Sequence, residues 1–260
     1  MAIENYENLL ADLKKLRLPA MAEMLDSYTK QAVSSNMSYM DFLSGLVSEE
    51  VMHKERKSIQ SKIKSAKFPV FKSLDDFDYA FQPSMDRKRL AELSSLRFID
   101  NKENILFLGP PGVGKTHLAT GLGVKACESG YKVLFTTLND MISTLLASMA
   151  DNSFPTRLRQ FIQPSLLIVD EFGYLPISAE GANFLFQVVA KRYETGSIIL
   201  TSNKSFADWG EVLGDSVIAS AVLDRLLHHS TVFSIRGDSY RLRDKRKELV
   251  KEEKKEITGH

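Results

Sequence analysis

Eight consecutive residues near the middle of the chain combine glycine, lysine and threonine in a pattern suited to holding phosphate. Residues 109–116 read GPPGVGKT, which has the form G-x-x-x-x-G-K-[ST]. The glycines let the backbone curl so that successive N–H groups point at phosphate oxygens. Lys115 supplies positive charge at the β- and γ-phosphates, and the Thr116 hydroxyl suits a magnesium ligand. The residues expected to contact the nucleotide are those of this loop and the one after it: Gly109, Pro110, Pro111, Gly112, Val113, Gly114, Lys115, Thr116 and His117.

Two adjacent carboxylates follow an apolar run some distance further along the chain. Residues 166–171 read LLIVDE, which predicts a buried strand ending in Asp170 and Glu171. Asp170 is placed to hold magnesium, and Glu171 to orient and deprotonate a water in line with the γ-phosphate. The alternative is an acid pair at a strand end with no chemical role. Together with the phosphate loop, the pair favours hydrolysis over phosphoryl transfer to a small acceptor.

Three further polar residues are weaker candidates for the same site. Asn203 follows the apolar run 198–201 and is placed to bind the γ-phosphate or the attacking water, or it is simply a turn residue. Arg225 is a candidate phosphate ligand, or a surface arginine paired with Asp224 or Glu211. Arg241 is a candidate phosphate sensor, or part of a basic tail.

The elements that position these residues alternate between strand and helix. Strands are expected at 105–108, 132–136, 166–170, 198–201 and 231–235, and helices at 116–129, 139–149, 179–193 and 216–228. Gly130 and Gly196 stand where helix C-caps are expected. This alternation predicts an α/β fold with a parallel sheet and helices on both faces. Before it, apolar stripes at helical spacing predict a small helical N-terminal domain, with a core of its own or with one stripe docked on a partner.

The composition excludes several classes of protein. The chain has 260 residues, 43 % of them hydrophobic and 26 % charged, with 34 Lys+Arg against 33 Asp+Glu. These values are typical of a globular protein rather than a disordered or collagenous one. No apolar run approaches the roughly 20 residues of a membrane span, and the first residues do not resemble a signal peptide. A lone cysteine, Cys127, forms no internal disulfide. We therefore expect a cytoplasmic protein without membrane contact.

The motifs, in this order and spacing, resemble an AAA+ ATPase of the initiator and helicase-loader branch. They are GPPGVGKT, LLIVDEFG, IILTSN and LDRL. The N-terminal LKKLRLPAMAEML and the GDSYRLR ending narrow the resemblance to the IstB family, the helper ATPases of insertion-sequence transposition, which are related to the DnaC helicase loaders. The resemblance covers nearly the whole chain. It implies a three-layer P-loop AAA+ domain. The change from a basic stretch at 53–72 to an acidic one at 73–86 places the domain boundary near Lys67–Pro69, so we expect a helical domain at 1–68, the AAA+ domain at 69–245 and a charged tail at 246–260.

The same resemblance implies a function and a set of partners. It points to an ATP- and Mg²⁺-dependent homo-oligomer that assembles on double-stranded DNA and delivers it to a transposase. Asn203 then matches sensor 1, Arg225 the arginine finger that reaches a neighbouring subunit, and Arg241 a sensor 2 arginine. Only residues 238–260 follow Gly237, so the helical lid that normally carries sensor 2 is expected to be absent or reduced. The rivals are a DnaC-like helicase loader and a small-molecule P-loop kinase.

Basic residues provide two candidate DNA contacts. Between residues 53 and 72, seven basic residues face one acid, Glu55, a local excess of +6. Such a stripe either tracks a phosphate backbone or is a solvated helix face. The second candidate is the stretch before the Asp170 strand, where this branch carries an extra helix. The candidates are Lys54, Arg56, Lys57, Lys62, Lys64, Lys67, Arg157 and Arg159.

Overall fold

Runs of branched and aromatic residues build a five-stranded parallel sheet in which the strands follow the order β2-β3-β4-β1-β5. The structure, a computed structural model, describes residues 2–242. The bounds of the strands are β1 (Asn104–Leu108), β2 (Val133–Thr137), β3 (Leu166–Phe172), β4 (Ser197–Ser202) and β5 (Ser230–Ser234). Since β1 lies between β4 and β5, residues from distant parts of the chain become neighbours at its carboxyl end.

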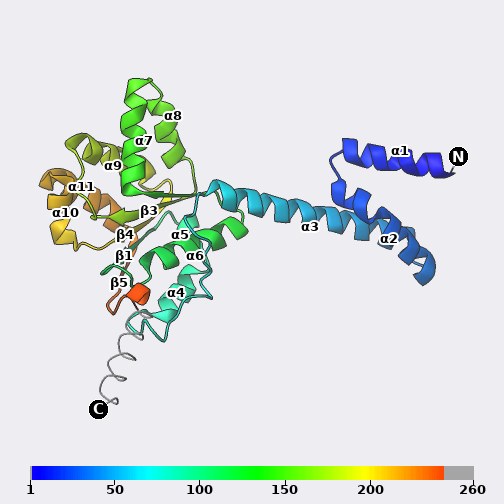
Figure 1. The fold of residues 1–260 in the computed structure, drawn as a ribbon, viewed down its shortest axis with the longest axis horizontal. Coiled ribbons are helices and arrows are strands. Elements are labelled where there is room, and N and C mark those ends of the chain that lie inside the picture. Colours follow the sequence, from blue (N-terminus) through cyan, green and yellow to red (C-terminus); the bar gives the residue numbers. More distant parts are fainter. Residues whose placement is uncertain (1, 243–260) are drawn as a thin grey trace, which may run out of the picture. The chain divides into compact units, whose positions relative to one another are not determined.

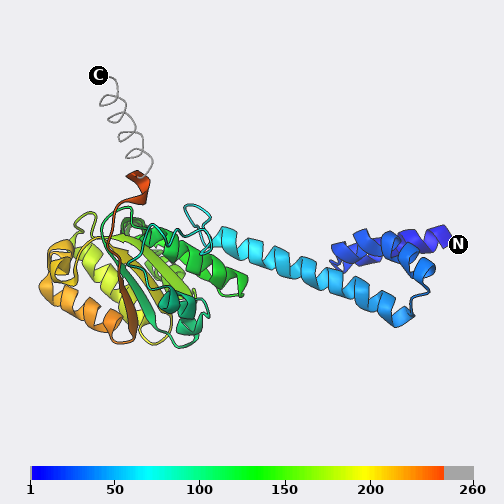
Figure 2. The same ribbon diagram turned by 90° about the horizontal axis from the view of Figure 1, so that it is seen from below.

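Alternate residues of each strand enter two separate cores, one on each face of the sheet. Ile105 and Phe107 of β1 pack into one core, with α4 (Arg87–Leu93), α5 (Arg97–Asp100) and α6 (Lys115–Glu128). Leu106 packs into the other core with the helices that follow β2. This period of two is what a sheet covered on both faces requires. Figures 1 and 2 show the three layers from two sides.

Five helices of the described chain cover the second face of the sheet. They are α7 (Leu138–Ala150), α8 (Phe154–Ile162), α9 (Ala179–Arg192), α10 (Trp209–Leu213) and α11 (Ser216–Leu227), with the short 3₁₀ turn η1 (Phe206–Asp208) before α10. A second 3₁₀ turn, η2 (Tyr240–Leu242), follows β5. Side-chain caps begin several of them. Thr137 accepts from the Asp140 N–H at the start of α7, and Asp215 accepts from the Val217 and Ile218 N–H groups at the start of α11.

The N-terminal part of the chain consists of three helices, α1 (Ala2–Lys15), α2 (Pro19–Ser35) and α3 (Tyr39–Ser65). Leu13, Leu25 and Leu46 form their small core. The chain divides into two compact units, residues 1–61 and 62–260, and the division falls inside α3. No helix within residues 2–242 is long and apolar enough to cross a membrane.

The α/β class, the five strands and the four main helices predicted from the sequence are confirmed within one or two residues at their ends. Gly130 follows Ser129, the residue after the end of α6, and has a φ of 91°, as the glycine that ends a helix commonly does. The C-cap expected at Gly196 is wrong. Helix α9 ends earlier, Glu194 takes the left-handed conformation, and Gly196 instead leaves room for the Arg192 guanidinium, 2.8 Å from where a Cβ would stand. The expected tail at 246–260 lies outside the described residues.

Candidate functional site

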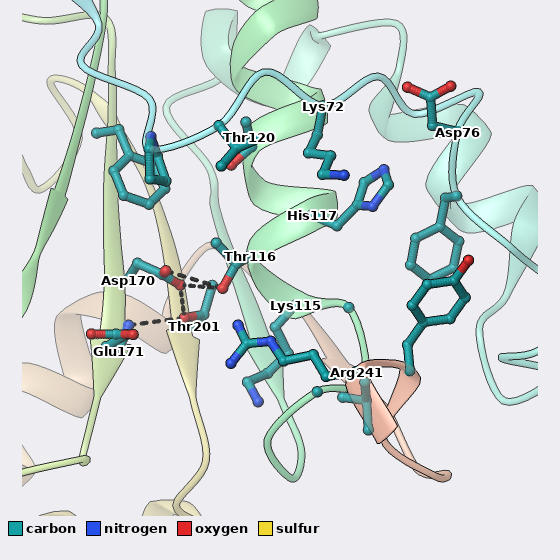
Figure 3. A pocket seen from close by; sticks show the side chains of 18 of the residues that line it. Lys72, Asp76, Lys115, Thr116, His117, Thr120, Asp170, Glu171, Thr201 and Arg241 are labelled. Atoms are coloured by element: carbon teal, nitrogen blue, oxygen red, sulfur yellow. Dashed lines mark hydrogen bonds between the residues drawn. The ribbon is translucent and has the colours of Figure 1, made fainter. Parts of the chain in front are cut away.

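A pocket of about 570 Å³ opens at the carboxyl ends of the strands, the end at which open α/β sheets bind ligands. Its size is within the usual range of ligand sites. The loop before α6 forms one wall, and the end of β2 contributes Thr137. The ends of β3 and β4 contribute Asp170, Glu171 and Thr201 (Figure 3). The glycine-rich loop and the Asp170–Glu171 pair thus converge on one cavity.

The glycine-rich loop adopts the curled conformation that its composition predicts. Gly112 and Gly114 have φ values of 83° and 98°, which residues with a side chain rarely adopt. Lys115 begins α6 and is buried, 5 % exposed. Its Nζ donates to the carbonyl oxygens of Gly109 at 2.6 Å and Pro110 at 2.8 Å. Burial lowers the pKa of Lys115 to about 8, against the opposing effect of the Asp170 carboxylate.

Thr116 and Asp170 are 54 residues apart in sequence and hydrogen-bonded in the structure. The Thr116 hydroxyl lies 3.1 and 3.0 Å from the two carboxylate oxygens of Asp170. Figure 3 shows the two side chains facing each other in the pocket. Asp170 is buried, 4 % exposed, and its carboxylate also accepts from the Thr201 hydroxyl. An adjacent hydroxyl and carboxylate form an all-oxygen donor set, which is what Mg²⁺ prefers. Thr116 and Asp170 therefore fit a magnesium site.

Glu171 stands beside this pair with an unusual backbone. Its φ is 61°, in the left-handed region that non-glycine residues seldom occupy. Its side chain is exposed and lines the pocket. Its N–H donates to the Thr201 hydroxyl at 3.1 Å. A carboxylate at this position is accessible to water and to a ligand held by the loop.

The segment after β5 crosses the glycine-rich loop and brings Arg241 to the pocket. The Tyr240 N–H donates to the Gly112 carbonyl at 2.9 Å, and Gln82 Nε2 donates to the Asp238 carbonyl at 3.2 Å. Arg241 lies in the short turn η2 and lines the pocket near Lys115 (Figure 3). The strap formed by residues 236–242, which follows β5, therefore places Arg241 at the pocket.

The predicted nucleotide and catalytic residues fall into two groups. Those that line the pocket are Gly112, Val113, Gly114, Lys115, Thr116, His117, Asp170, Glu171 and Arg241. Those outside the pocket lining formed by residues 2–242 are Gly109, Pro110, Pro111, Asn203 and Arg225. The carbonyls of Gly109 and Pro110 hold Lys115, so these residues act through the loop's conformation.

Asn203 and Arg225 have distinct surroundings. The Asn203 Oδ1 is buried and has no hydrogen-bond partner among residues 2–242. Arg225, in the last turn of α11, donates to the Ala221 carbonyl at 3.0 Å and lies over the Phe186 ring at 4.8 Å. No ion pair of Arg225 with Asp224 or Glu211 occurs within the described chain.

The candidate DNA-binding residues lie on two helices, except Lys67, which lies beyond the end of α3. Helix α3 carries the first group, Lys54, Arg56, Lys57, Lys62 and Lys64, and Lys67 follows it. Lys54 is within 3.8 Å of the buried Glu50 carboxylate. Arg157 and Arg159 lie on α8, which forms in the stretch where an extra helix was expected, and both are exposed.

Sequence reasoning missed the segment before α4 and one strand residue. The segment contributes Phe77, Asp78 and Gln82 to the pocket, and a Cβ added to Gly114 would lie 2.6 Å from the Phe77 ring. His117 Nε2 is 2.7 Å from the Ser73 carbonyl, which ties the segment to α6. The second omission, Thr201, stands two residues before Asn203 in the IILTSN run. Its polar side chain in an otherwise apolar strand was the available signal.

Comparison with known proteins gives close relatives over most of the chain. A family profile described as IstB-like ATP binding protein matches residues 11–248. The insertion sequence IS5376 ATP-binding protein of Geobacillus stearothermophilus is 51 % identical over 232 residues, 89 % of this chain and 92 % of the relative. The corresponding protein of IS21 from Pseudomonas aeruginosa is 46 % identical over 235 residues, 90 % and 89 % of the two chains.

Solved structures share the fold at lower sequence identity. The DnaC helicase loader superposes with a TM-score of 0.51 at 22 % identity, over 63 % of this chain and 96 % of that one. AMPPCP-bound DnaA from Aquifex aeolicus gives 0.55 at 18 % identity, over 70 % of this chain and 55 % of DnaA, little more than half its length. These likenesses show an AAA+ P-loop fold. With the profile match and the close relatives, they establish that this chain belongs to the family of IstB-like ATP-binding proteins.

Proposed function

We propose that this chain is an ATP-dependent helper of transposition, which binds and hydrolyses ATP, assembles with further copies on duplex DNA and delivers that DNA to a transposase. The observation that carries the ATPase part is the direct contact of Thr116 with Asp170 in a pocket that also contains Lys115 and Glu171. The names of the relatives, which are ATP-binding proteins of insertion sequences, support the transposition part.

Nucleotide binding follows from the loop and the helix behind it. The N–H groups of residues 112–116 and the N-terminus of α6 supply donors and a positive dipole end for the phosphates. Lys115 exchanges its two carbonyl partners for phosphate oxygens. Thr116 and Asp170 would hold Mg²⁺, which would supply positive charge against the phosphates when bound.

Hydrolysis needs a base and positive charge near the γ-phosphate. Glu171 lies one residue beyond the magnesium ligand, where its carboxylate accepts a proton from the attacking water. Arg241 reaches the pocket within the same subunit, and Asn203 stands after the neighbouring strand β4. Arg225 is outside the pocket, so its proposed role requires a second subunit. A small-molecule kinase has no need of a carboxylate that activates water, so Glu171 favours hydrolysis.

Two substitutions test the nucleotide site. Lys115→Ala removes the charge that faces the phosphates and should abolish tight ATP binding. Glu171→Gln keeps the shape of the side chain and loses the base, so it should bind ATP normally and hydrolyse it at least about 100-fold more slowly. Binding of a fluorescent ATP analogue and release of phosphate measure the two effects separately. Equal turnover by the wild type and Glu171→Gln would remove Glu171 from this role.

Duplex binding is proposed to be electrostatic and without strong sequence preference, because the candidate residues are lysines and arginines outside any base-reading motif. Neutralising Lys62, Lys64 and Lys67 together should weaken ATP-dependent binding equally for unrelated duplexes. It should also reduce the log–log salt slope by up to about 0.9 for each phosphate that the variant no longer neutralises.

The matched variant for this test neutralises Arg157 and Arg159 on α8. If the Lys62, Lys64 and Lys67 variant has wild-type affinity and salt slope while the Arg157 and Arg159 variant is reduced in both, the DNA interface belongs to α8. Affinity that depends on duplex sequence would contradict the electrostatic proposal for both helices.

The partner is proposed to be a transposase rather than a replicative helicase. The purified transposase of the same insertion sequence, immobilised as bait, should retain the chain when ATP and duplex DNA are present. Retention by a replicative helicase alone would favour the helicase-loader alternative.

A further inference from the structure

One buried hydroxyl on β4 is bonded to both acidic residues of the site. Thr201 is 1 % exposed. Its Oγ1 donates to Asp170 Oδ1 and accepts from the Glu171 N–H at 3.1 Å. Figure 3 shows Thr201 between the two, with both hydrogen bonds drawn. The hydroxyl therefore uses its single donor and one acceptor position on the two acidic residues, each of which has a proposed chemical role.

The strand pairing explains why a side chain is needed here. Val169 of β3 pairs with Leu200 of β4, and the next pair is Phe172 with Ser202. Two residues of β3, Asp170 and Glu171, thus stand opposite the single residue Thr201. This is a β-bulge, which locally interrupts the ladder and redirects side chains.

The bulge decides where the two carboxylates point. In a regular strand, Asp170 and Glu171 would project to opposite faces of the sheet. Glu171 instead takes a φ of 61°, so the surroundings must hold a backbone conformation that is costly for a residue with a side chain. Phe172 anchors one side, buried and stacked on Trp209 with ring centroids 3.9 Å apart. Thr201 holds the other side.

We propose that Thr201 is a positioning residue, whose hydroxyl fixes the Asp170–Glu171 bulge so that one carboxylate faces the metal site and the other faces the attacking water. The proposal rests on the proposed ATPase function of the same site. Without the hydroxyl, Asp170 loses a donor that fixes its rotamer, and the Glu171 N–H loses its acceptor inside the protein. Both carboxylates then sample orientations that do not serve the reaction.

The test compares two substitutions that differ in one functional group. Thr201→Val keeps the shape and removes the hydroxyl, whereas Thr201→Ser keeps the hydroxyl. Removal of an outer partner of a metal-binding carboxylate typically costs about 10–100-fold in metal affinity or activity. We expect Thr201→Val to lower kcat by that factor with little change in the KM for ATP, and Thr201→Ser to remain within a few-fold of the wild type.

Two readouts do not depend on turnover. Mn²⁺ binding in the presence of a non-hydrolysable ATP analogue, followed by electron paramagnetic resonance, should weaken about 10–100-fold in Thr201→Val only. Amide hydrogen exchange of the protein alone should accelerate at Glu171 in Thr201→Val and not in Thr201→Ser. The control is Ser197→Ala, which removes another buried hydroxyl of β4, bonded to the Phe98 carbonyl at 2.9 Å. It should leave the Mn²⁺ affinity and the exchange at Glu171 unchanged.

The outcomes separate this proposal from the proposed function. Wild-type kcat and Mn²⁺ affinity in Thr201→Val would overturn the positioning role, whatever the exchange shows. Equal losses in Thr201→Val and Thr201→Ser would also overturn it, because packing rather than the hydroxyl would then matter. If the wild type does not hydrolyse ATP, the proposed function fails. Faster exchange at Glu171 together with weaker Mn²⁺ binding in Thr201→Val would then still support the positioning role of Thr201.

Discussion

Lys115 is buried in the wall of the pocket, and its ammonium group is bonded to two carbonyl oxygens of its own loop. Burial opposes the charged form and lowers its pKa to about 8. A bound triphosphate acts in the other direction, since negative charge close to the ammonium favours protonation. ATP binding and proton uptake by Lys115 are therefore coupled near this pH.

We predict that ATP affinity falls as the pH rises above about 8. Binding at a pH about one unit higher should be accompanied by proton uptake, because most Lys115 side chains are neutral before ATP binds and charged afterwards. Isothermal titration calorimetry in buffers of different ionisation enthalpy measures the number of protons. Each further pH unit should weaken affinity by up to about tenfold.

The matched variant for the pH prediction is Lys115→Arg. A guanidinium stays charged throughout this range, so its binding, although weaker, should take up no proton under the same alkaline conditions. The same proton count in the variant and the wild type would assign the uptake to another group.

At the scale of helices and strands, one buried arginine joins α8, α9 and the starts of β3 and β4. Arg192, the last residue of α9, is 1 % exposed and donates to five backbone carbonyls. These belong to Phe161, Ile162, Pro164, Ser165 and Ser197. Burial lowers its pKa to about 10, so it remains charged at neutral pH. Its charge also faces the C-terminal end of α8, where cations are favourable.

We predict that Arg192→Met lowers the free energy of unfolding by roughly 3–5 kcal/mol, because it leaves several buried carbonyls without a donor. Arg192→Lys should recover little, since an ammonium cannot match the planar fork. Trp209 is the chain's single tryptophan and is buried beside Phe172, so its fluorescence during urea unfolding reports on the sheet-containing unit.

The control for Arg192 is Arg159→Met, which removes an exposed arginine from α8. Its effect should be within about 0.5 kcal/mol of zero. A similar loss in both variants would mean that the buried hydrogen bonds of Arg192 add no stability beyond that of an exposed arginine.

For the whole molecule, the positions of the two candidate arginines have different consequences. Arg241 reaches the pocket of its own subunit, whereas Arg225 lies on α11, outside the pocket lining of the described chain. If Arg225 supplies charge to a γ-phosphate, it does so in a neighbouring copy. An arginine finger contributes about 10³–10⁵ in rate, so activity would then require assembly.

We predict that ATPase activity per subunit rises with protein concentration and with added duplex DNA. Arg225→Ala should bind nucleotide and lose hydrolysis. The deciding measurement mixes Arg225→Ala, which has an intact pocket, with Lys115→Ala, which has an intact Arg225. The mixture should recover activity at mixed interfaces. Normal hydrolysis by Arg225→Ala alone, or a confirmed mixed assembly without activity, would exclude the role in trans.

The sequence by itself determined the features that depend on neighbouring residues. The loop of residues 109–116, the Asp170–Glu171 pair and the alternation of strands and helices are all local patterns. Glycine spacing selects the loop conformation, and periods of two or about 3.6 residues select strand or helix. These patterns predicted the fold class and the main strands and helices, and they identified Lys115, Thr116, Asp170 and Glu171, which line one pocket.

Only the tertiary structure decided which distant residues meet at the site. The parallel sheet places Thr201 opposite the Asp170–Glu171 bulge, 31 and 30 residues away in sequence. The strap after β5 brings Arg241 across the loop, and the segment before α4 adds Phe77 and Gln82. The physical reason is that such contacts depend on the order of the strands and the path of their connections. Since β1 pairs with both β4 and β5, the pocket combines side chains whose separation in the chain carries no local signal.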